Sequence, residues 1–366
     1  MTELMIKTEM FNSEANNNVI NNIIADSQTM IDYLVPQKDL FIGNDDETQN
    51  PFMYIPTCKR TGDVNKLFFH DNSIEQIGAK SDIPTAYLKK LHKGQEWQKN
   101  LFTRTLNDHF NYLNRNTPIL LRTSKNKVKA YLSNSYERYN SIEVLKEFLL
   151  SFYREEMTVS HAYYDGITHF VELTNKSNPI IIFDQPHFFG IQYRNSDFGR
   201  AALDIKFMLI KQVCMNGMVM KTALRQIHKS RKMEIVGDSF QLSAETMNKE
   251  TEAKKSLIRD IAKHVCGTEV RNELVAMYDK ASAIDIAPEK VLKVLPSVGA
   301  TQKDVEDIQN LLMGNLEHTG VREGGNIIRI ANAVSYLANR YDNKQAESIC
   351  KYREMSGKII TKFVNN

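Results

Sequence analysis

The triplet Asp204-Ile205-Lys206, with Asp184 before it in the chain, is the pattern in this sequence that comes nearest to a catalytic site. Two carboxylates on neighbouring strands and a lysine two residues on are what a metal-dependent nuclease uses to hold a divalent ion and orient water. In a chain with 25% charged residues the same pattern arises easily by chance, and Lys206 could instead pair with an acid across a sheet. We therefore keep a nuclease as a minor alternative, and the sequence favours a protein that is not an enzyme.

Histidines and cysteines give no sign of a metal site. The dipeptide DG at 165–166 is typical of a two-residue hairpin turn. Such a turn would set His161 opposite Phe170 and His169 opposite Ala162, with the two imidazoles on opposite faces. No two of the four cysteines lie two or three residues apart, which argues against a zinc ribbon or a disulfide framework and indicates a reducing compartment. A glycine-rich phosphate loop and a nucleophile elbow are also missing, so we expect no cofactor and no bound metal.

A basic and aromatic strand face is the first candidate for binding. The stretches ILLRT and VKAYL surround a polar turn and predict a hairpin, in which period-2 alternation separates apolar residues from the others. The second face carries Lys127, Lys129 and Tyr131, with Arg122 and Lys125 near the turn. Such a face suits single-stranded nucleic acid, because cations meet phosphates and each base can stack on an aromatic ring for roughly 1–3 kcal/mol. An ordinary solvated outer face would have the same pattern.

A second basic cluster follows in KTALRQIHKSRK. Its members are Lys221, Arg225, His228, Lys229, Arg231 and Lys232. On a helix, four of these residues, at 221, 225, 228 and 232, would share one face. Like charges on one face repel each other and are tolerated best when they meet a polyanion, although a solubilising surface helix is the alternative. Three arginines complete the candidate nucleic-acid contacts: Arg138, Arg194 and Arg200.

The net charge of +3 hides two unlike segments. Residues 1–50 contain two lysines and nine aspartates or glutamates, for −7, and residues 191–233 contain nine lysines or arginines and two aspartates, for +7. The basic segment is what a polyanion-binding groove requires. The acidic segment could cover that groove in a neighbouring subunit until DNA competes, or could imitate DNA toward a host protein.

Hydrophobic periodicity divides the chain into four regions. We expect a partly flexible acidic arm at 1–50, a mixed and mainly helical region at 51–117, a sheet core with a basic face at 118–233, and a helical subdomain at 234–366. In the last region a period of 3.6 predicts helices near 243–265, 268–283, 301–315, 325–341 and 344–362. The predicted fold class is α+β, with a central antiparallel sheet of meander-like hairpins and a helical C-terminal subdomain.

The sequence gives no sign of a membrane segment. The amino terminus opens acidic, and nowhere do eighteen apolar residues occur together. We therefore expect a soluble protein in the cytoplasm of the cell that makes it.

Several stretches resemble a known family in the same order. They are ILLRTSKNKVKAYLSNSYERYNSIEVL, FFGIQYRNSDFGRAALDIKFMLIKQVCMNGMVM, LRQIHKS and GNIIRIANAVSYLANRYDNKQAESICKYREMSGKII. Together they are similar to the phage/plasmid-like family catalogued as domain of unknown function nine-three-two, over roughly 118–362. The closest parts are SYERY at 135–139, the Asn195-Ser196 and Gly199 turn, and CMNGM at 214–218 followed by His228. The resemblance implies a mobile-element origin and carries over no catalytic residue.

The combined features favour a phage nucleic-acid-binding protein. We expect it to bind single-stranded DNA, to promote strand annealing in replication or recombination, and to form a homo-oligomer such as a ring or filament. The alternative is a non-enzymatic phage protein that binds and inhibits or redirects a host factor.

Overall fold

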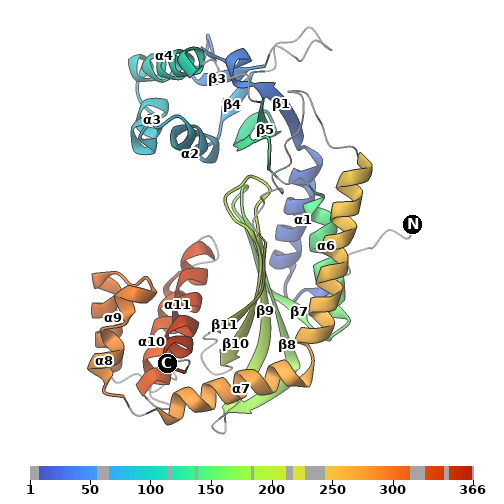
Figure 1. Cartoon of the computed structure of the whole chain (residues 1–366), viewed down its shortest axis with the longest axis vertical. Helices are drawn as coiled ribbons and strands as arrows, with labels where there is room; N and C mark the ends of the chain where they lie inside the picture. The colour runs from blue at the N-terminus through green and yellow to red at the C-terminus, as the bar shows by residue number, and fades with distance from the viewer. Residues whose placement is uncertain are drawn as a thin grey trace.

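The structure is a computed structural model, and it describes residues 8–55, 66–113, 118–136, 139–182, 185–211, 217–226, 244–284, 286–313, 326–341 and 346–364. These residues form two mostly antiparallel sheets, with helices beside each of them and a helical C-terminal region. The predicted α+β class is confirmed. Figure 1 shows the two sheets one above the other, with the C-terminal helices beside the lower one.

The first sheet has the strand order β1-β5-β6-β4-β3-β2, in which only β4 and β6 run parallel. Its strands are β1 (Ile31–Pro36), β2 (Phe41–Asn44), β3 (Pro51–Tyr54), β4 (Leu67–Phe69), β5 (Pro118–Ser124) and β6 (Lys127–Ser133). Its helices are α2 (Asp71–Lys80), α3 (Thr85–His92) and α4 (Glu96–Leu113). Phe102, Leu106 and Phe110 recur every four residues along α4 and are fully buried in the core under this sheet. The predicted boundary at residue 118 is wrong, because the β5–β6 hairpin pairs with strands from the first seventy residues.

The acidic arm predicted at 1–50 is, over residues 8–50, part of the fold. Ser13 caps α1 (Glu14–Gln28) by accepting a hydrogen bond from the Asn16 amide. Ile20 and Ile23 of α1 are buried in the main core, and β1 pairs with β5 along its whole length. Burial of these apolar residues outweighs the polar composition from which a flexible arm was expected.

The second sheet is a meander, as predicted, but the predicted sheet also included the β5–β6 hairpin, which belongs to the first sheet. Its strands are β7 (Thr158–Tyr164), β8 (His169–Ile182), β9 (Gln185–Asn195), β10 (Leu203–Lys211) and β11 (Gly217–Gln226), each antiparallel to the next. Therefore β11 is an edge strand. The cluster predicted to be helical at 221–232 is a strand up to Gln226, because its backbone pairs with β10, and residues 227–232 lie outside the described part of the chain.

The hairpin of β7 and β8 has a longer turn than predicted. Asp165 accepts hydrogen bonds from the amides of residues 167 and 168, so Tyr164 pairs with His169 and His161 pairs with Glu172. The two-residue register is therefore wrong. The two imidazoles nonetheless lie on opposite faces of the sheet. His161 contacts the ring of Phe170, and Phe170 points to the face opposite that of its neighbour His169.

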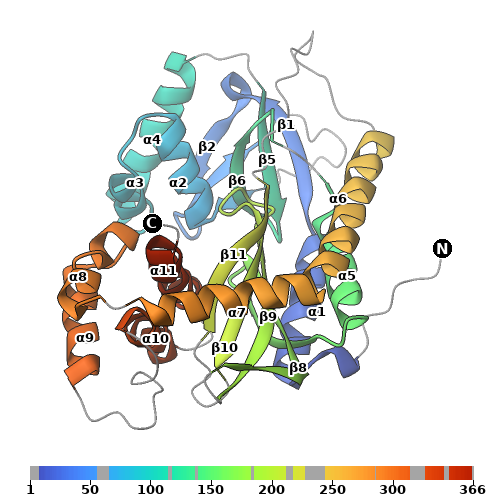
Figure 2. The ribbon, with the colours of Figure 1, turned by 60° about the horizontal axis from the view of Figure 1, so that its bottom comes forward.

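Helices cover both faces of the second sheet. One face is covered by α1 together with α5 (Ser141–Tyr153) and α6 (Ala244–Val265). The other face is covered by α10 (Asn326–Leu337) and α11 (Ala346–Val364). Between them the chain runs through α7 (Thr268–Ala283), α8 (Pro288–Leu292) and α9 (Gln302–Met313), and α7 crosses the end of the sheet (Figure 2). The predicted C-terminal helices are confirmed within a few residues over the described positions. None of the described helices has the length and apolar character needed to cross a membrane.

Gly357 lets α11 approach the edge strand of the second sheet. A Cβ atom at this position would lie 1.6 Å from the carbonyl oxygen of Val219 in β11. No other residue allows so close a contact between a helix and a strand backbone. As a result, side chains of α11 lie directly over the polar face of β9, β10 and β11.

Candidate nucleic-acid interface

The β5–β6 hairpin does not present the predicted basic and aromatic face. Ala130 pairs with Arg122 and Val128 pairs with Thr123, so Lys129 is the extra residue of a β-bulge. A bulge interrupts the period-2 alternation and puts Tyr131 on the same side as Val128. Both residues belong to the core beneath α2 and α4, and Tyr131 is only 1% exposed.

The cations of the hairpin are neutralised by acids of the first 50 residues. Arg122 donates two hydrogen bonds to Asp32, of 2.7 and 2.9 Å, and a third of 2.7 Å to the Asp197 carbonyl. Burial lowers the pKa of Arg122, but the hydrogen bonds and charge of Asp32 outweigh burial and raise the pKa above its usual value. Lys129 donates to Asp26 at 3.1 Å.

Asp26 is the centre of a second set of contacts. Burial raises the pKa of Asp26, whereas hydrogen bonds from Lys125, Tyr164 and Lys129 outweigh it and hold the pKa below its usual value. Arg122 and Lys129 are therefore structural cations and are not available to a polyanion. Lys125 and Lys127 remain exposed at the turn.

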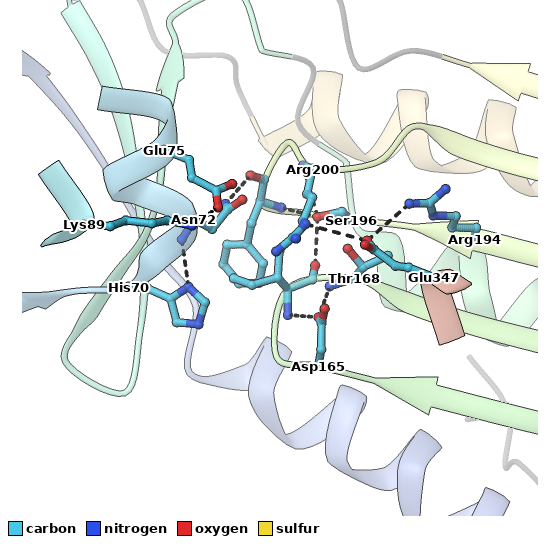
Figure 3. Close-up of polar contacts among 12 residues, drawn as sticks. His70, Asn72, Glu75, Lys89, Asp165, Thr168, Arg194, Ser196, Arg200 and Glu347 are labelled. Atoms are coloured by element: carbon cyan, nitrogen blue, oxygen red, sulfur yellow. Dashed lines mark hydrogen bonds and ion pairs between the residues drawn. The ribbon is translucent and has the colours of Figure 1, made fainter. Parts of the chain in front are cut away.

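The same hairpin joins the two sheets. The Asn72 side chain of α2 donates to the carbonyl of Phe198 in the β9–β10 turn, at 3.0 Å (Figure 3). It also donates to the carbonyl of Lys129, at 2.9 Å, and so connects β6 with that turn. Gly199 in that turn has φ +74°, and a Cβ there would lie 2.5 Å from the Leu132 side chain. The Asn195–Gly199 turn is therefore architectural, as its sequence predicted.

Two of the three nuclease candidates, Asp204 and Lys206, belong to an ion-pair network. Lys206 lies 2.6 Å from Asp204 on its own strand and 2.6 Å from Glu354 of α11. Burial lowers the pKa of Lys206, but the two carboxylates outweigh it and raise the pKa, so the ammonium stays charged. Asp184 lies outside the described residues. Over the described chain, no three His, Cys, Asp or Glu side chains come together as metal ligands.

A further group of cations follows strands β9, β10 and β11, and all of its members except Lys206 are at least partly exposed. Arg194 and Arg225 are the cross-strand neighbours of Asp204 on its two sides, and Arg200 follows in the β9–β10 turn. A groove of about 340 Å³ lies between β11 and α11, lined among others by Lys206, Arg225 and Lys358. We call this group the β9–β11 basic groove; its cations are Arg194, Arg200, Lys206, Arg225 and Lys358.

Two of these cations have no acidic partner in the described part of the chain. Arg225 and Lys358 are exposed, and neither forms an ion pair with a described residue. Arg194 and Arg200 both approach Glu347 in the first turn of α11, at 3.4 and 3.6 Å (Figure 3). The groove thus combines five cations with the three carboxylates of Asp204, Glu347 and Glu354, which leaves it positive.

A larger cavity of about 510 Å³ lies on the other side of the second sheet, among α1, α5 and α6. Its lining contains two cations, Arg122 and Lys146, and two acids, Asp32 and Glu143, which pair with each other. Because these charges cancel, this cavity attracts a polyanion less strongly than the β9–β11 basic groove does.

The sequence identified three of the groove cations as nucleic-acid contacts, and Lys206 as a nuclease candidate, but it missed the part contributed by α11. Lys358, Glu347 and Glu354 follow the basic strands by more than 120 residues, and no local pattern connects them. Of the remaining candidates, Lys221 lies on β11 but its side chain is not described. Arg138, His228, Lys229, Arg231 and Lys232 lie outside the described residues.

Comparison with protein-family models, with curated proteins and with solved structures gave no match for this chain. The resemblance to the phage/plasmid-like family therefore stays a prediction from the sequence.

Proposed function

We propose that this protein binds nucleic acid, with single-stranded DNA favoured, through the β9–β11 basic groove. The observation that carries the proposal is the pair Arg225 and Lys358, two exposed cations without a described acidic partner on facing walls of one groove. Cations that no described acid neutralises add positive charge to the groove, and a phosphate backbone is the polyanion that such a groove tracks.

The sequence beyond β11 supports the same location. The chain leaves the strand at Gln226, beside Leu203 and hence next to the β9–β10 turn that carries Arg200. The next six residues, IHKSRK, add three lysines or arginines and a histidine. Positive charge therefore accumulates in the sequence where the strand ends at the groove.

A single strand fits this arrangement better than a duplex. The groove is bounded by one strand edge and one helix, and its volume of about 340 Å³ accepts a short stretch of one backbone. We propose a role in replication or recombination of a mobile element, in the cytoplasm of its host, with annealing as the activity.

The test is binding of a fluorescein-labelled oligo(dT) and of a labelled duplex of equal length, measured by anisotropy over a series of salt concentrations. With four to five phosphate contacts the logarithm of affinity for the single strand should fall against log salt with a slope of about −3. Absence of binding at low salt, or a flat salt response, would refute the proposal.

The alternative of a host-factor inhibitor rests on the nine acids of residues 1–50, and some of these acids are engaged within the chain. Asp26 and Asp32, two of the acids that were to imitate DNA, are held in ion pairs within the chain.

A further inference from the structure

One carboxylate oxygen of Glu347 lies between two guanidinium groups of the second sheet. Its Oε1 is 3.4 Å from Nη2 of Arg194, at the end of β9, and 3.6 Å from Nε of Arg200, in the β9–β10 turn. Figure 3 shows the three side chains converging from two elements that are far apart in the sequence. Two arginines that share one acidic oxygen form the same arrangement with which proteins grip a phosphate.

This contact is longer and more exposed than the buried ion pair of Arg122 with Asp32. The side chains of Glu347, Arg200 and Arg194 are 46%, 37% and 29% exposed, and both distances exceed those of charge-assisted hydrogen bonds. By contrast, Arg122 and Asp32 are 6% and 28% exposed and 2.7 Å apart. Water and other anions therefore reach Glu347, and its carboxylate can be replaced at little cost.

The replacement requires no movement of α11. Ile349, Met355 and Ile359 anchor this helix in the main core, and Ser356 donates a hydrogen bond to the Ala331 carbonyl of α10. Glu347 lies in the first turn of the helix, two residues before Ile349, and its side chain projects toward the β9–β10 turn (Figure 3). A side-chain rotation is enough to free both arginines.

We propose that the Glu347 carboxylate occupies the position of a backbone phosphate and acts as an internal competitor that a bound nucleic-acid strand displaces. The inference rests on the proposed function, and it assigns Arg194 and Arg200 as one phosphate subsite of the β9–β11 basic groove. Isolated small anions would gain little over Glu347, whereas a strand that also engages Arg225 and Lys358 can displace it. The competitor thus favours a continuous phosphate backbone over free phosphates.

The experiment compares the parent protein with Glu347→Gln in the oligo(dT) anisotropy assay at low salt. The variant should bind about fivefold more tightly, because the two arginines are no longer shared with an acid; a factor of five is about 1 kcal/mol. Glu245→Gln is the matched control, because it removes the same charge from an exposed helical ion pair with Lys249 on α6, across the sheet. This control should change affinity by less than about twofold.

A double variant separates the inference from the proposed function. Arg200→Gln should weaken binding, and adding it to Glu347→Gln should remove most of the gain. If Glu347→Gln binds like the parent while Arg225→Gln binds more weakly, nucleic-acid binding stands and the internal competitor is refuted. If Glu245→Gln gives the same gain as Glu347→Gln, the effect is one of net charge and the subsite is refuted. If neither the parent nor any variant binds at low salt, both proposals fail.

Discussion

The guanidinium of Arg122 and the carboxylate of Asp32 face each other across the β1–β5 pair and are joined by two hydrogen bonds. Arg122 is 5% exposed, so this pair withdraws from solvent a cation that the sequence assigned to nucleic-acid binding. Its third hydrogen bond, to the Asp197 carbonyl, extends the contact to the second sheet. The pair thus links the two sheets and has a structural role.

Removing the acid of this pair should destabilise the fold. Asp32→Asn leaves the buried charge of Arg122 without compensation, which should lower the free energy of unfolding by about 2–3 kcal/mol. Urea denaturation followed by circular dichroism measures the change. The exposed helical pair Arg104 and Asp108 is the control, and Asp108→Asn should cost less than about 0.5 kcal/mol. Equal effects at both sites would contradict the structural role of Arg122.

The buried ring of Tyr131 gives a prediction opposite to the one from the strand pattern. Tyr131 stacks on Phe110, with 6.2 Å between ring centroids and 3° between planes. Tyr131→Ala should therefore cost about 3–5 kcal/mol of stability through a core cavity. Trp97→Ala, at a side chain that is 62% exposed, should leave stability nearly unchanged. Thermal unfolding of the two variants distinguishes them, and a stable Tyr131→Ala protein with weakened DNA binding would restore the stacking hypothesis.

Arg225 and Lys358 should each account for one phosphate contact. Arg225→Gln and Lys358→Gln should each weaken oligo(dT) binding and reduce the magnitude of the salt slope by about 0.7, and the double variant by about 1.4. Lys263→Gln is the matched control, because Lys263 is an exposed lysine of α6 on the other side of the sheet. If Lys263→Gln changes the salt slope as much as the two groove variants do, the effect is one of net charge and not of these two contacts.

The pH dependence of stability should report on His161. Burial, and secondly the charge of Arg353, lower the pKa of His161 to about 4. Between about pH 6.5 and pH 4, His161 is protonated in the unfolded chain but not in the folded chain. The free energy of unfolding therefore falls as the pH drops through this window. The loss from pH 8 to pH 5 should reach about 2 kcal/mol from this residue.

Substitution of this histidine tests the sign. In His161→Gln the decrease in unfolding free energy between pH 8 and pH 5, measured by urea denaturation, should be smaller than in the parent. His169, whose pKa burial also lowers, remains in both proteins and contributes equally. A steeper decrease in the variant would contradict the assignment.

The edge strands of the first sheet give a prediction for self-association. Ile31 of β1 and Phe41 of β2 lie on its two edges and are 54% and 56% exposed. An exposed edge with a large apolar side chain is a site where a second copy can add a strand. We expect light scattering to show a homo-oligomer that Ile31→Lys or Phe41→Lys dissociates. A monomeric parent protein would contradict this expectation.

The sequence by itself determined the elements whose pattern is local. The 3.6-residue period gave the C-terminal helices, and the succession of hairpins gave the meander of β7 to β11, because main-chain hydrogen bonds and the burial of one face operate between residues close in the chain. The left-handed turn at Gly199 was equally readable.

Only the tertiary structure decided which charges are available. Alternation along β6 predicted an exposed basic face. In the structure a bulge at Lys129 interrupts the alternation, and both Lys129 and Tyr131 are buried. Asp26 and Asp32 neutralise cations about 90 to 100 residues away, and Glu347 approaches arginines about 150 residues before it. Burial and charge pairing depend on which segments meet in space, and a sequence pattern describes only residues that are neighbours along the chain.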